Sequence, residues 1–240
     1  RSAFVTGVQT CALPISRDGF SATREGGGGS AIDGGREALS LIAVSELCRV
    51  SMGMVTAMGV SVGLAAGTIM SRGTPEQRQR WALDLLTFDK VGAWAITEPD
   101  SGSDAFGGMK STLRADGDDY VLNGQKTFIT NGPYADTLVV YAKLDGEIAT
   151  CVLDSGMPGL TQSKPLRKMG IHSSPTGQLF FDNVRIGPDR MLAGGGRESA
   201  RANFASERFG VAAMSLGIIE ECLRLSVSVQ IGRASCRERV

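Results

Sequence analysis

The feature that most constrains this chain is the run from Val50 to Ser71, which contains no charged residue. A helix of this length could span a bilayer, and Gly59, Gly63 and Gly67 have the four-residue spacing found where membrane helices pack closely. However, hydroxyl residues and glycines dilute the run, and no aromatic residue anchors its ends. We therefore interpret the run as a helix packed tightly against other helices, and we expect no membrane span.

Helical periodicity continues on both sides of this run. Between Glu37 and Arg49 one helical face collects the apolar residues Leu39, Ile42, Ala43 and Leu47. After the run, Thr74 precedes Pro75, and Gln77 stands three residues after the threonine. This arrangement is typical of a capping box with proline in the first turn, so it predicts a helix start. Residues 78–86 should continue that helix.

From Val91 onward the pattern changes from helical to alternating, which indicates strands. Asn123-Gly124 and Asp145-Gly146 each interrupt an alternating stretch, and such pairs supply the positive φ angles of a tight hairpin turn. The predicted strands are 120–122, 125–130, 137–144, 148–154 and 178–186.

The order of helices, strands and a final helix predicts an α+β fold. We expect residues 17–90 to form part of an N-terminal helical domain. Residues 91–197 should form an antiparallel, β-barrel-like domain, and residues 198–229 the first helix of a truncated C-terminal helical bundle. The glycine-rich stretch from Asp18 to Gly35 reads as a flexible linker or tail.

The two ends share an unusual property at the level of codons. Ala12-Leu13-Pro14-Ile15 can be encoded by GCT CTT CCG AT plus one base, and Ile231-Gly232-Arg233-Ala234 by ATC GGA AGA GC plus one base. These strings are reverse complements, as translated sequencing adapters would be. The ordinary alternative is an N-terminal strand and a basic tail. We expect 1–16 and 230–240 to be adapter-derived and non-native.

Composition excludes several classes of function. The formal net charge is zero, so a nucleic-acid partner is not expected. The single histidine is His172, and no two cysteines have the spacing that zinc or a redox dithiol needs, so we expect no metal site. We interpret the thiols as reduced and buried. The five cysteines are Cys11, Cys48, Cys151, Cys222 and Cys236.

The strongest chemical signal is the segment from Trp94 to Asp104, with the sequence WAITEPDSGSD. It combines a strand end, a proline turn, a glycine and several hydroxyls. Such a turn can bind an anion or the polar edge of a ring through its amides. A capped surface turn is the alternative that spacing alone favours.

This segment resembles the Thr-Glu-Pro-x-x-Gly-Ser-Asp signature of the acyl-CoA dehydrogenase family. Residues 124–132, GQKTFITNG, resemble the second flavin segment of that family. Further matches occur in the order and approximate spacing of the family, at 73–77, 181–184 and 207–208. The resemblance covers about residues 20–229 and implies FAD as cofactor and a homotetramer when full length.

The resemblance also implies the site residues. Ser103 would lie near the coenzyme A arm as well as the flavin, and Arg208 would contact the substrate. Hydroxyls and amides there could hydrogen-bond the ring, and aromatic surface could exclude water. The implied flavin-contacting residues are Trp94, Ile96, Thr97, Gly102, Ser103, Phe128, Ile129 and Thr130.

The implied reaction is α,β-dehydrogenation of an acyl-CoA thioester in fatty acid metabolism, with electrons passed to an electron-transfer flavoprotein. A carboxylate must remove the α-proton from a dry pocket that raises its pKa. By position Glu207 is the candidate, and the alternatives are a solvated glutamate paired with an arginine or a base in absent C-terminal helices.

Three other interpretations stay open. An oxygen-using acyl-CoA oxidase or flavin monooxygenase would share the fold, and the chain by itself could be an inactive binding module. We expect the chain alone to bind FAD weakly or not at all and to aggregate, because a wall of the pocket would be missing. The expected location is the cytoplasm.

Overall fold

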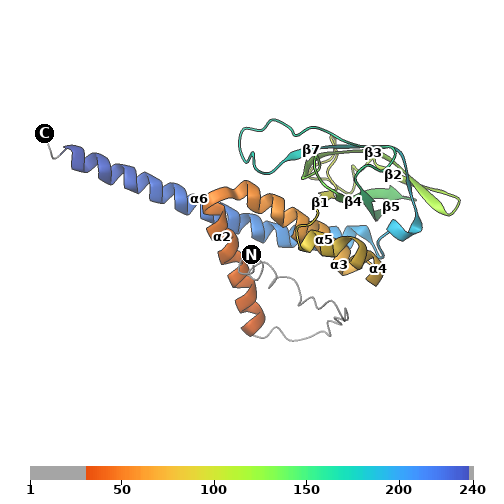
Figure 1. Ribbon diagram of the computed structural model, residues 1–240, viewed down its shortest axis with the longest axis horizontal. Helices are drawn as coiled ribbons and strands as arrows, with labels where there is room; N and C mark the ends of the chain where they lie inside the picture. The colour runs from red at the N-terminus through yellow and green to blue at the C-terminus, as the bar shows by residue number, and fades with distance from the viewer. Residues whose placement is uncertain (1–30, 238–240) are drawn as a thin grey trace. The chain divides into compact units, whose positions relative to one another are not determined.

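The computed structural model describes residues 31–237 (Figure 1). The chain forms two compact units. One joins the residues up to Val55 with those from Ser206 onward, and the other spans Thr56–Ala205. The predicted segment 1–16 and most of the predicted glycine-rich linker lie outside the described residues. The end of that linker is helical, because the first helix begins at Ala31.

The charge-free run is helical throughout but not uniform. Helix α2 (Ala31–Gly59) contains a kink at Ser51, whose φ and ψ are −156° and 95°. A π-helical segment, η1 (Val60–Ala66), and helix α3 (Gly67–Arg72) follow. By length and composition the stretch Ala38–Arg72 could cross a membrane, a test that core helices also pass. Ala65 and Ile69 are fully buried in a core cluster, which supports the core interpretation.

Helix α2 confirms the helix predicted between Glu37 and Arg49, but the expected tight packing around the row of glycines is not complete. Gly59 and Gly63 face open space in the described chain, whereas Gly67 is half-buried. The apolar face predicted between Glu37 and Arg49 is exposed at Leu39 and Ile42. The buried positions are instead Ser45 and Cys48, because α2 meets Gly217 at Ser45. A glycine is required there, since a Cβ would lie 2.0 Å from the Ser45 carbonyl oxygen.

The predicted capping box is confirmed. Thr74 accepts a hydrogen bond from the Gln77 amide at 3.3 Å, and the Gln77 side chain accepts one from the Thr74 amide at 2.9 Å. The helical turns that follow are α4 (Pro75–Gln77), η2 (Arg78–Ala82) and α5 (Leu83–Leu86).

A seven-stranded curled sheet forms the rest of the second unit, which confirms the α+β class. The strand order is β1-β4-β2-β3-β7-β6, with β5 pairing β4. The sheet is not wholly antiparallel as expected, because β4 pairs in parallel with both β1 and β2. The strands are β1 (Gly92–Ala95), β2 (Thr112–Asp116), β3 (Asp119–Thr130), β4 (Thr137–Leu144), β5 (Glu147–Asp154), β6 (Leu160–Gln162) and β7 (Thr176–Ile186).

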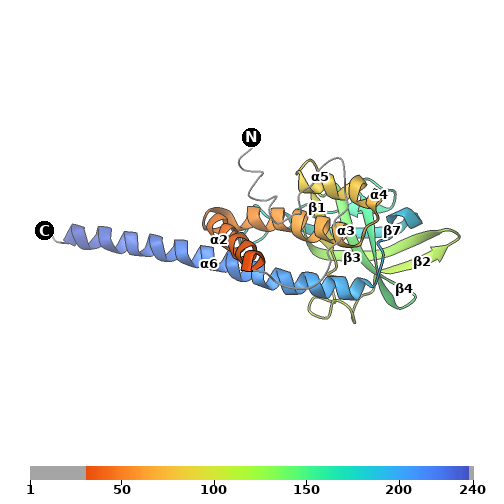
Figure 2. The same cartoon turned by 90° about the horizontal axis from the view of Figure 1, so that it is seen from below.

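One predicted hairpin is confirmed and the other is wrong. Asp145 and Gly146 both have positive φ, 51° and 86°, and turn β4 directly into β5. Asn123-Gly124 instead lies within the continuous strand β3, where the pairing with β7 shifts register. The turn before β3 falls at Gly117, at the tip of the hairpin that projects from the sheet in Figure 2.

The sheet separates two apolar cores because successive side chains point to opposite faces. Trp94, Val139 and Tyr141 pack on the side of α3 and α5, which Figure 1 shows lying along one side of the strands. Leu138 and Leu153 pack on the inner side of the curled sheet. The site segments therefore start from a strand, β1, that is buried on both faces.

After a short 3-10 turn, η3 (Pro188–Arg190), the last helix is α6 (Gly196–Arg237). It confirms the predicted terminal helix but continues beyond Val229 into residues 230–237. The cysteine expectation holds only in part. Cys48 and Cys151 are buried, whereas Cys222 on α6 is exposed. Burial raises the pKa of the Cys151 thiol to about 12.

Candidate active site

A closed loop follows β1 and contains the first predicted site segment. The Glu98 and Ser101 main chains exchange hydrogen bonds of 3.2 and 3.1 Å. The Ser101 hydroxyl donates to the Asp104 carbonyl, and the Asp104 carboxylate accepts from the Gly107 amide at 3.1 Å. These local bonds satisfy much of the loop's own backbone and leave Gly102 and Ser103 exposed at its surface.

The structure brings the two predicted segments together. The Thr127 amide donates to the Thr97 carbonyl at 2.9 Å, and Lys126 Nζ donates to the Ile96 carbonyl at 3.1 Å. Residues 96–97, at the end of β1, therefore lie directly beside residues 126–127 in β3. The sequence places these segments about thirty residues apart, and only the sheet makes them neighbours.

Two buried charges lie at this junction. Lys126 Nζ is 2.8 Å from Glu98 Oε1, with side-chain exposures of 0% and 4%. Burial lowers the pKa of the Lys126 amine. Burial alone would raise the pKa of the Glu98 carboxyl, but hydrogen bonds from Lys126 and Ser111 prevail and lower it. We conclude that the carboxyl is ionised, because it accepts from three donors at once.

The end of β3 is irregular in a way that presents an aromatic ring. Phe128 has a φ of 56°, rare for a bulky residue, and is 68% exposed. It lies in a second register shift against β7, between Lys126 and Ile129. Asn131, with a φ of 64°, donates to the Ala57 and Gly92 carbonyls at 2.8 and 2.9 Å. Bulges and strained residues of this kind recur beside functional sites.

Three hydroxyls at this surface are available to a ligand. Within the described part of the chain, the side chains of Thr97, Ser103 and Thr130 make no hydrogen bond. These hydroxyls and the exposed ring of Phe128 belong to the two segments that β1 and β3 bring together, and they offer donors, acceptors and apolar surface. Such a set fits the polar edge and the flat face of a flavin ring.

Three other predicted site residues have buried side chains. Ile96 and Ile129 belong to the two apolar cores. Trp94 is 7% exposed, and its ring packs edge-on against Tyr141 and Phe204, at centroid distances of 5.1 and 5.6 Å. In this structure these residues can therefore offer a ligand little beyond their main-chain groups.

Glu207 and Arg208 lie on α6 in the other compact unit. Both side chains are exposed. Partial burial nevertheless raises the pKa of the Glu207 carboxyl above its ordinary value, the direction that a general base near neutral pH needs. Farther along the same helix, Glu221 pairs with Arg224 and Arg49.

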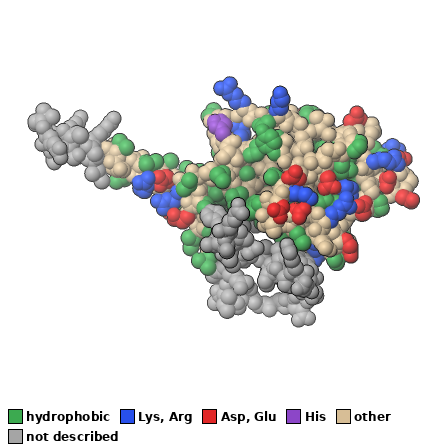
Figure 3. Space-filling model, viewed as in Figure 1, with side chains coloured by type: hydrophobic (Ala, Val, Ile, Leu, Met, Phe, Trp, Pro, Cys, Tyr) green, Lys and Arg blue, Asp and Glu red, His purple; other side chains and the backbone are tan. Residues whose placement is uncertain are grey.

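The single histidine lies on the surface, as Figure 3 shows in purple. His172 is in the long connection between β6 and β7, and its Nε2 lies 2.7 Å from the Lys168 carbonyl oxygen. Among the residues that the structure describes, no group of three or more His, Cys, Asp or Glu side chains could hold a metal ion.

Sequence reasoning missed the buried pair of Glu98 and Lys126. Both residues stand inside the quoted motifs, but the direct neighbours of Lys126, Gln125 and Thr127, are polar and give no local sign that the lysine is buried. A small depression of about 80 Å³ lies beside this pair. Its lining residues are Glu98, Pro99, Asp100, Lys110, Ser111, Gly124 and Gln125.

Comparison with known families agrees with this architecture. The acyl-CoA dehydrogenase N-terminal domain matches residues 19–89, and the acyl-CoA dehydrogenase middle domain matches residues 93–184. The chain belongs to the acyl-CoA dehydrogenase family. Glu207 and Arg208 lie outside both matched ranges.

Individual known proteins are also similar to this chain in sequence and structure. The short-chain specific acyl-CoA dehydrogenase of Megasphaera elsdenii is 37% identical over 222 residues, which cover 88% of this chain and 58% of that protein. A structure of the electron transferring flavoprotein of Acidaminococcus fermentans contains a chain that is 37% identical, with a TM-score of 0.74 over 79% of this chain and 52% of that one.

A glutaryl-CoA dehydrogenase from Mycobacterium smegmatis, solved in complex with FADH2, is 30% identical. Its TM-score is 0.74, and the match covers 80% of this chain and 49% of that one. The chain thus spans about half the length of the relatives that it matches.

Proposed function

We propose that the protein to which this chain belongs is an FAD-dependent acyl-CoA dehydrogenase that removes the α and β hydrogens of an acyl-CoA thioester. The observation that carries this proposal is the junction of β1 and β3, where the two motif segments meet through the Thr127–Thr97 hydrogen bond. Membership of the family supports the reaction class.

FAD supplies the hydride acceptor when it is bound. Thr97, Ser103 and Thr130 would hold the polar edge of the ring through hydroxyls that have no other hydrogen bond in the described structure. Phe128 would cover apolar ring surface and exclude water. The amides of Gly102 and Ser103, on the exposed part of the loop, would favour negative charge near the ring. Trp94, Ile96 and Ile129 would contribute main-chain groups.

Glu207 is the proposed base that accepts the α-proton of the substrate on its carboxylate. The raised pKa of this carboxyl agrees with such a role. Arg208 would contact the thioester substrate beside it. The electron acceptor is proposed to be an electron-transfer flavoprotein, in line with the relative from Acidaminococcus fermentans.

The test is an anaerobic titration of the complete gene product that contains this sequence, after loading with FAD. Butyryl-CoA is the first substrate, because one relative is short-chain specific, and longer and branched acyl-CoAs follow. Addition should bleach the flavin absorption in the wild type. Glu207→Gln should bind acyl-CoA but bleach at least ~1000-fold more slowly, about 4 kcal/mol in barrier.

The outcomes separate the parts of the proposal. Equal bleaching in Glu207→Gln and wild type would keep the dehydrogenase and remove Glu207 as the base. Rapid reoxidation by air would favour an oxidase of the same fold. A protein that stays colourless after attempted FAD loading would contradict the flavin proposal itself.

A further inference from the structure

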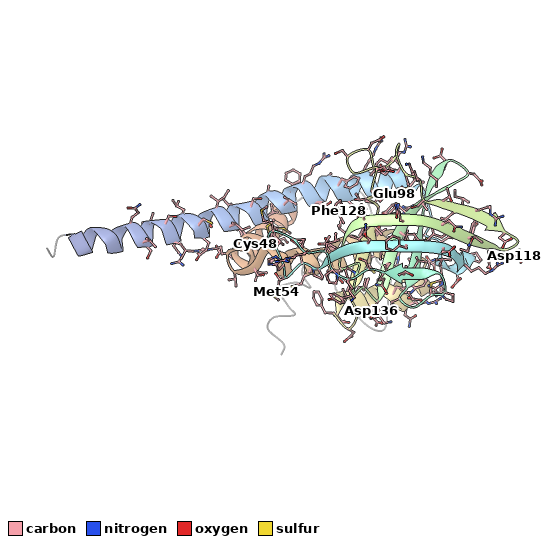
Figure 4. All side chains as sticks on the ribbon, turned by 90° about the horizontal axis from the view of Figure 1, so that it is seen from above. Cys48, Met54, Glu98, Asp118, Phe128 and Asp136 are labelled. Carbon is pink, nitrogen blue, oxygen red and sulfur yellow. The ribbon has the colours of Figure 1, made fainter. Side chains whose placement is uncertain are left out.

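The buried pair of Glu98 and Lys126 connects the two segments of the proposed flavin site. Glu98 directly follows Thr97, and Lys126 precedes Phe128 by two residues. Figure 4 labels Glu98 and Phe128 on the same body of strands, with Asp118 at the outer tip of the β2–β3 hairpin. A movement of this pair would therefore be transmitted directly to residues proposed to touch the ring.

The carboxylate of Glu98 closes the loop at both of its ends. Glu98 stands where the loop leaves β1, and its Oε2 and Oε1 accept from the amides of Lys110 and Ser111, at 2.6 and 3.0 Å, where the loop enters β2. Lys126 then attaches this closed loop to β3 through Glu98 Oε1, at 2.8 Å. The same amine donates to the Ile96 carbonyl and so also fixes the end of β1.

A buried ion pair is a poor way to gain stability alone. Removing two charges from water costs free energy that their attraction often fails to recover, and apolar replacements of similar volume are frequently as stable. The attraction does, however, disfavour every arrangement in which the two charges separate. A pair at this position thus favours one geometry of the loop over others, whatever its net effect on stability.

We infer that Glu98 and Lys126 are positioning residues, whose ion pair holds the loop from Pro99 to Lys110 against β3 in the geometry that the flavin requires. The inference rests on the proposed function, since it names what sets the geometry of that site. Neither side chain touches the ligand. Both are buried and act through Thr97, Ser103 and Phe128.

The test uses the complete gene product in three forms: Lys126→Met, Glu98→Gln and the double variant. Three properties are measured for each, namely the urea midpoint of unfolding, the hydrogen exchange of loop peptides by mass spectrometry, and the Kd for FAD. Each single variant should lower the midpoint, because one charge stays buried without its partner. The double variant should recover most of that midpoint.

The decisive measurements are the loop exchange and the FAD affinity of the double variant. If the pair positions the loop, loop amides should exchange about tenfold faster than in the wild type, and FAD should bind about tenfold more weakly, despite the recovered midpoint. Wild-type exchange and wild-type FAD affinity in the double variant would overturn the inference, since the pair would then be only structural.

A matched control lies in the same loop. Asp100 and Lys110 form an ion pair of 2.7 Å whose side chains are both largely exposed. Asp100→Asn combined with Lys110→Met should change neither loop exchange nor FAD affinity. An effect as large as that of the buried pair would contradict the inference. If the wild type binds no FAD, the proposed function fails, and the exchange comparison alone then decides whether the pair holds the loop.

Discussion

The two compact units differ in how far they bury their own large apolar side chains. The unit from Thr56 to Ala205 packs two apolar cores and even supplies a buried lysine with a carboxylate. The helices of the other unit expose large apolar side chains along their length. These include Leu39, Ile42, Leu47, Val50, Phe209, Leu216, Ile219, Leu223 and Val229.

This difference indicates which region of the chain can hold a ligand site in place through its own contacts, without other protein. The β1–β3 junction needs no outside group to hold Thr97 beside Thr127, because buried hydrogen bonds and the cores already do so. The exposed helices have apolar surface of the kind that other protein usually covers. We therefore expect substitutions to have large effects in the first region and small effects in the second.

The largest contrast should come from two leucines. Leu153→Ala removes a fully buried side chain from the inner core, so the free energy of unfolding should fall by about 2–5 kcal/mol. Leu223→Ala removes a side chain that is 63% exposed, and we expect less than about 0.5 kcal/mol. Urea unfolding measures both, followed by tryptophan fluorescence for the unit that contains the buried Trp81 and Trp94 and by far-UV circular dichroism for the helices that contain Leu223. Equal losses would show that Leu223 is covered in solution.

Gly124→Ala should come next, at about 2–3 kcal/mol of lost stability. Its φ is +138°, and an added Cβ would lie 2.7 Å from Ser111 Cα. Gly146→Ala is the control, because Gly146 also has a positive φ, +86°, but faces open space. Backbone strain alone should cost it about 1 kcal/mol. If the two variants lose the same stability, the close approach of β3 to Ser111 is not a constraint.

The buried carboxylate of Glu98 should make the stability of the protein depend on pH in the acid range. The pKa of Glu98 is lower in the folded protein than in the unfolded chain, so its contribution to stability is present above the unfolded pKa. That contribution is lost as the pH falls below about 4.3 and through the folded pKa. Glu98→Gln should be less stable at pH 7 but should lose stability less steeply in acid. Urea midpoints between pH 7 and 3 measure the slopes, and equal slopes in Glu98→Gln and wild type would contradict the prediction.

The smallest predicted effect concerns the helix cap at Thr74. Thr74→Ala removes the hydroxyl that accepts from the Gln77 amide and should cost about 1 kcal/mol. Thr74→Ser keeps an acceptor and should stay within about 0.5 kcal/mol of the wild type by the same urea assay. A serine variant as unstable as the alanine variant would argue against the capping bond.

Local chemistry explains which elements the sequence could predict. The capping box and the Asp145-Gly146 turn depend on neighbouring residues only, and both are confirmed. Asn123-Gly124 carries the same turn signal, but β3 runs on through it: Asn123 is the last residue paired with β2, and Gly124 pairs with Phe181 of β7. A bulge and a hairpin turn both use a glycine with positive φ, so the local signal cannot separate them.

For the candidate site too, local sequence could predict some features and not others. The motif residues Thr97 and Thr130 were found from sequence, and the sheet brings their segments together. Burial of Trp94 could not be read locally, because Tyr141 and Phe204, which cover its ring, lie far along the chain. The pairing of Glu98 with Lys126 was missed for the same reason.

The most direct test of the account is the affinity of the complete gene product for FAD when only the β1–β3 junction is changed. The wild type is compared by equilibrium titration with Thr97→Val and Thr130→Val, which keep side-chain volume and remove one hydroxyl each. The account predicts that both variants fold with nearly wild-type urea midpoints and bind FAD about tenfold more weakly or worse, since each loses a hydrogen bond to the ring. Unchanged FAD affinity in both variants would contradict the placement of the flavin at this junction.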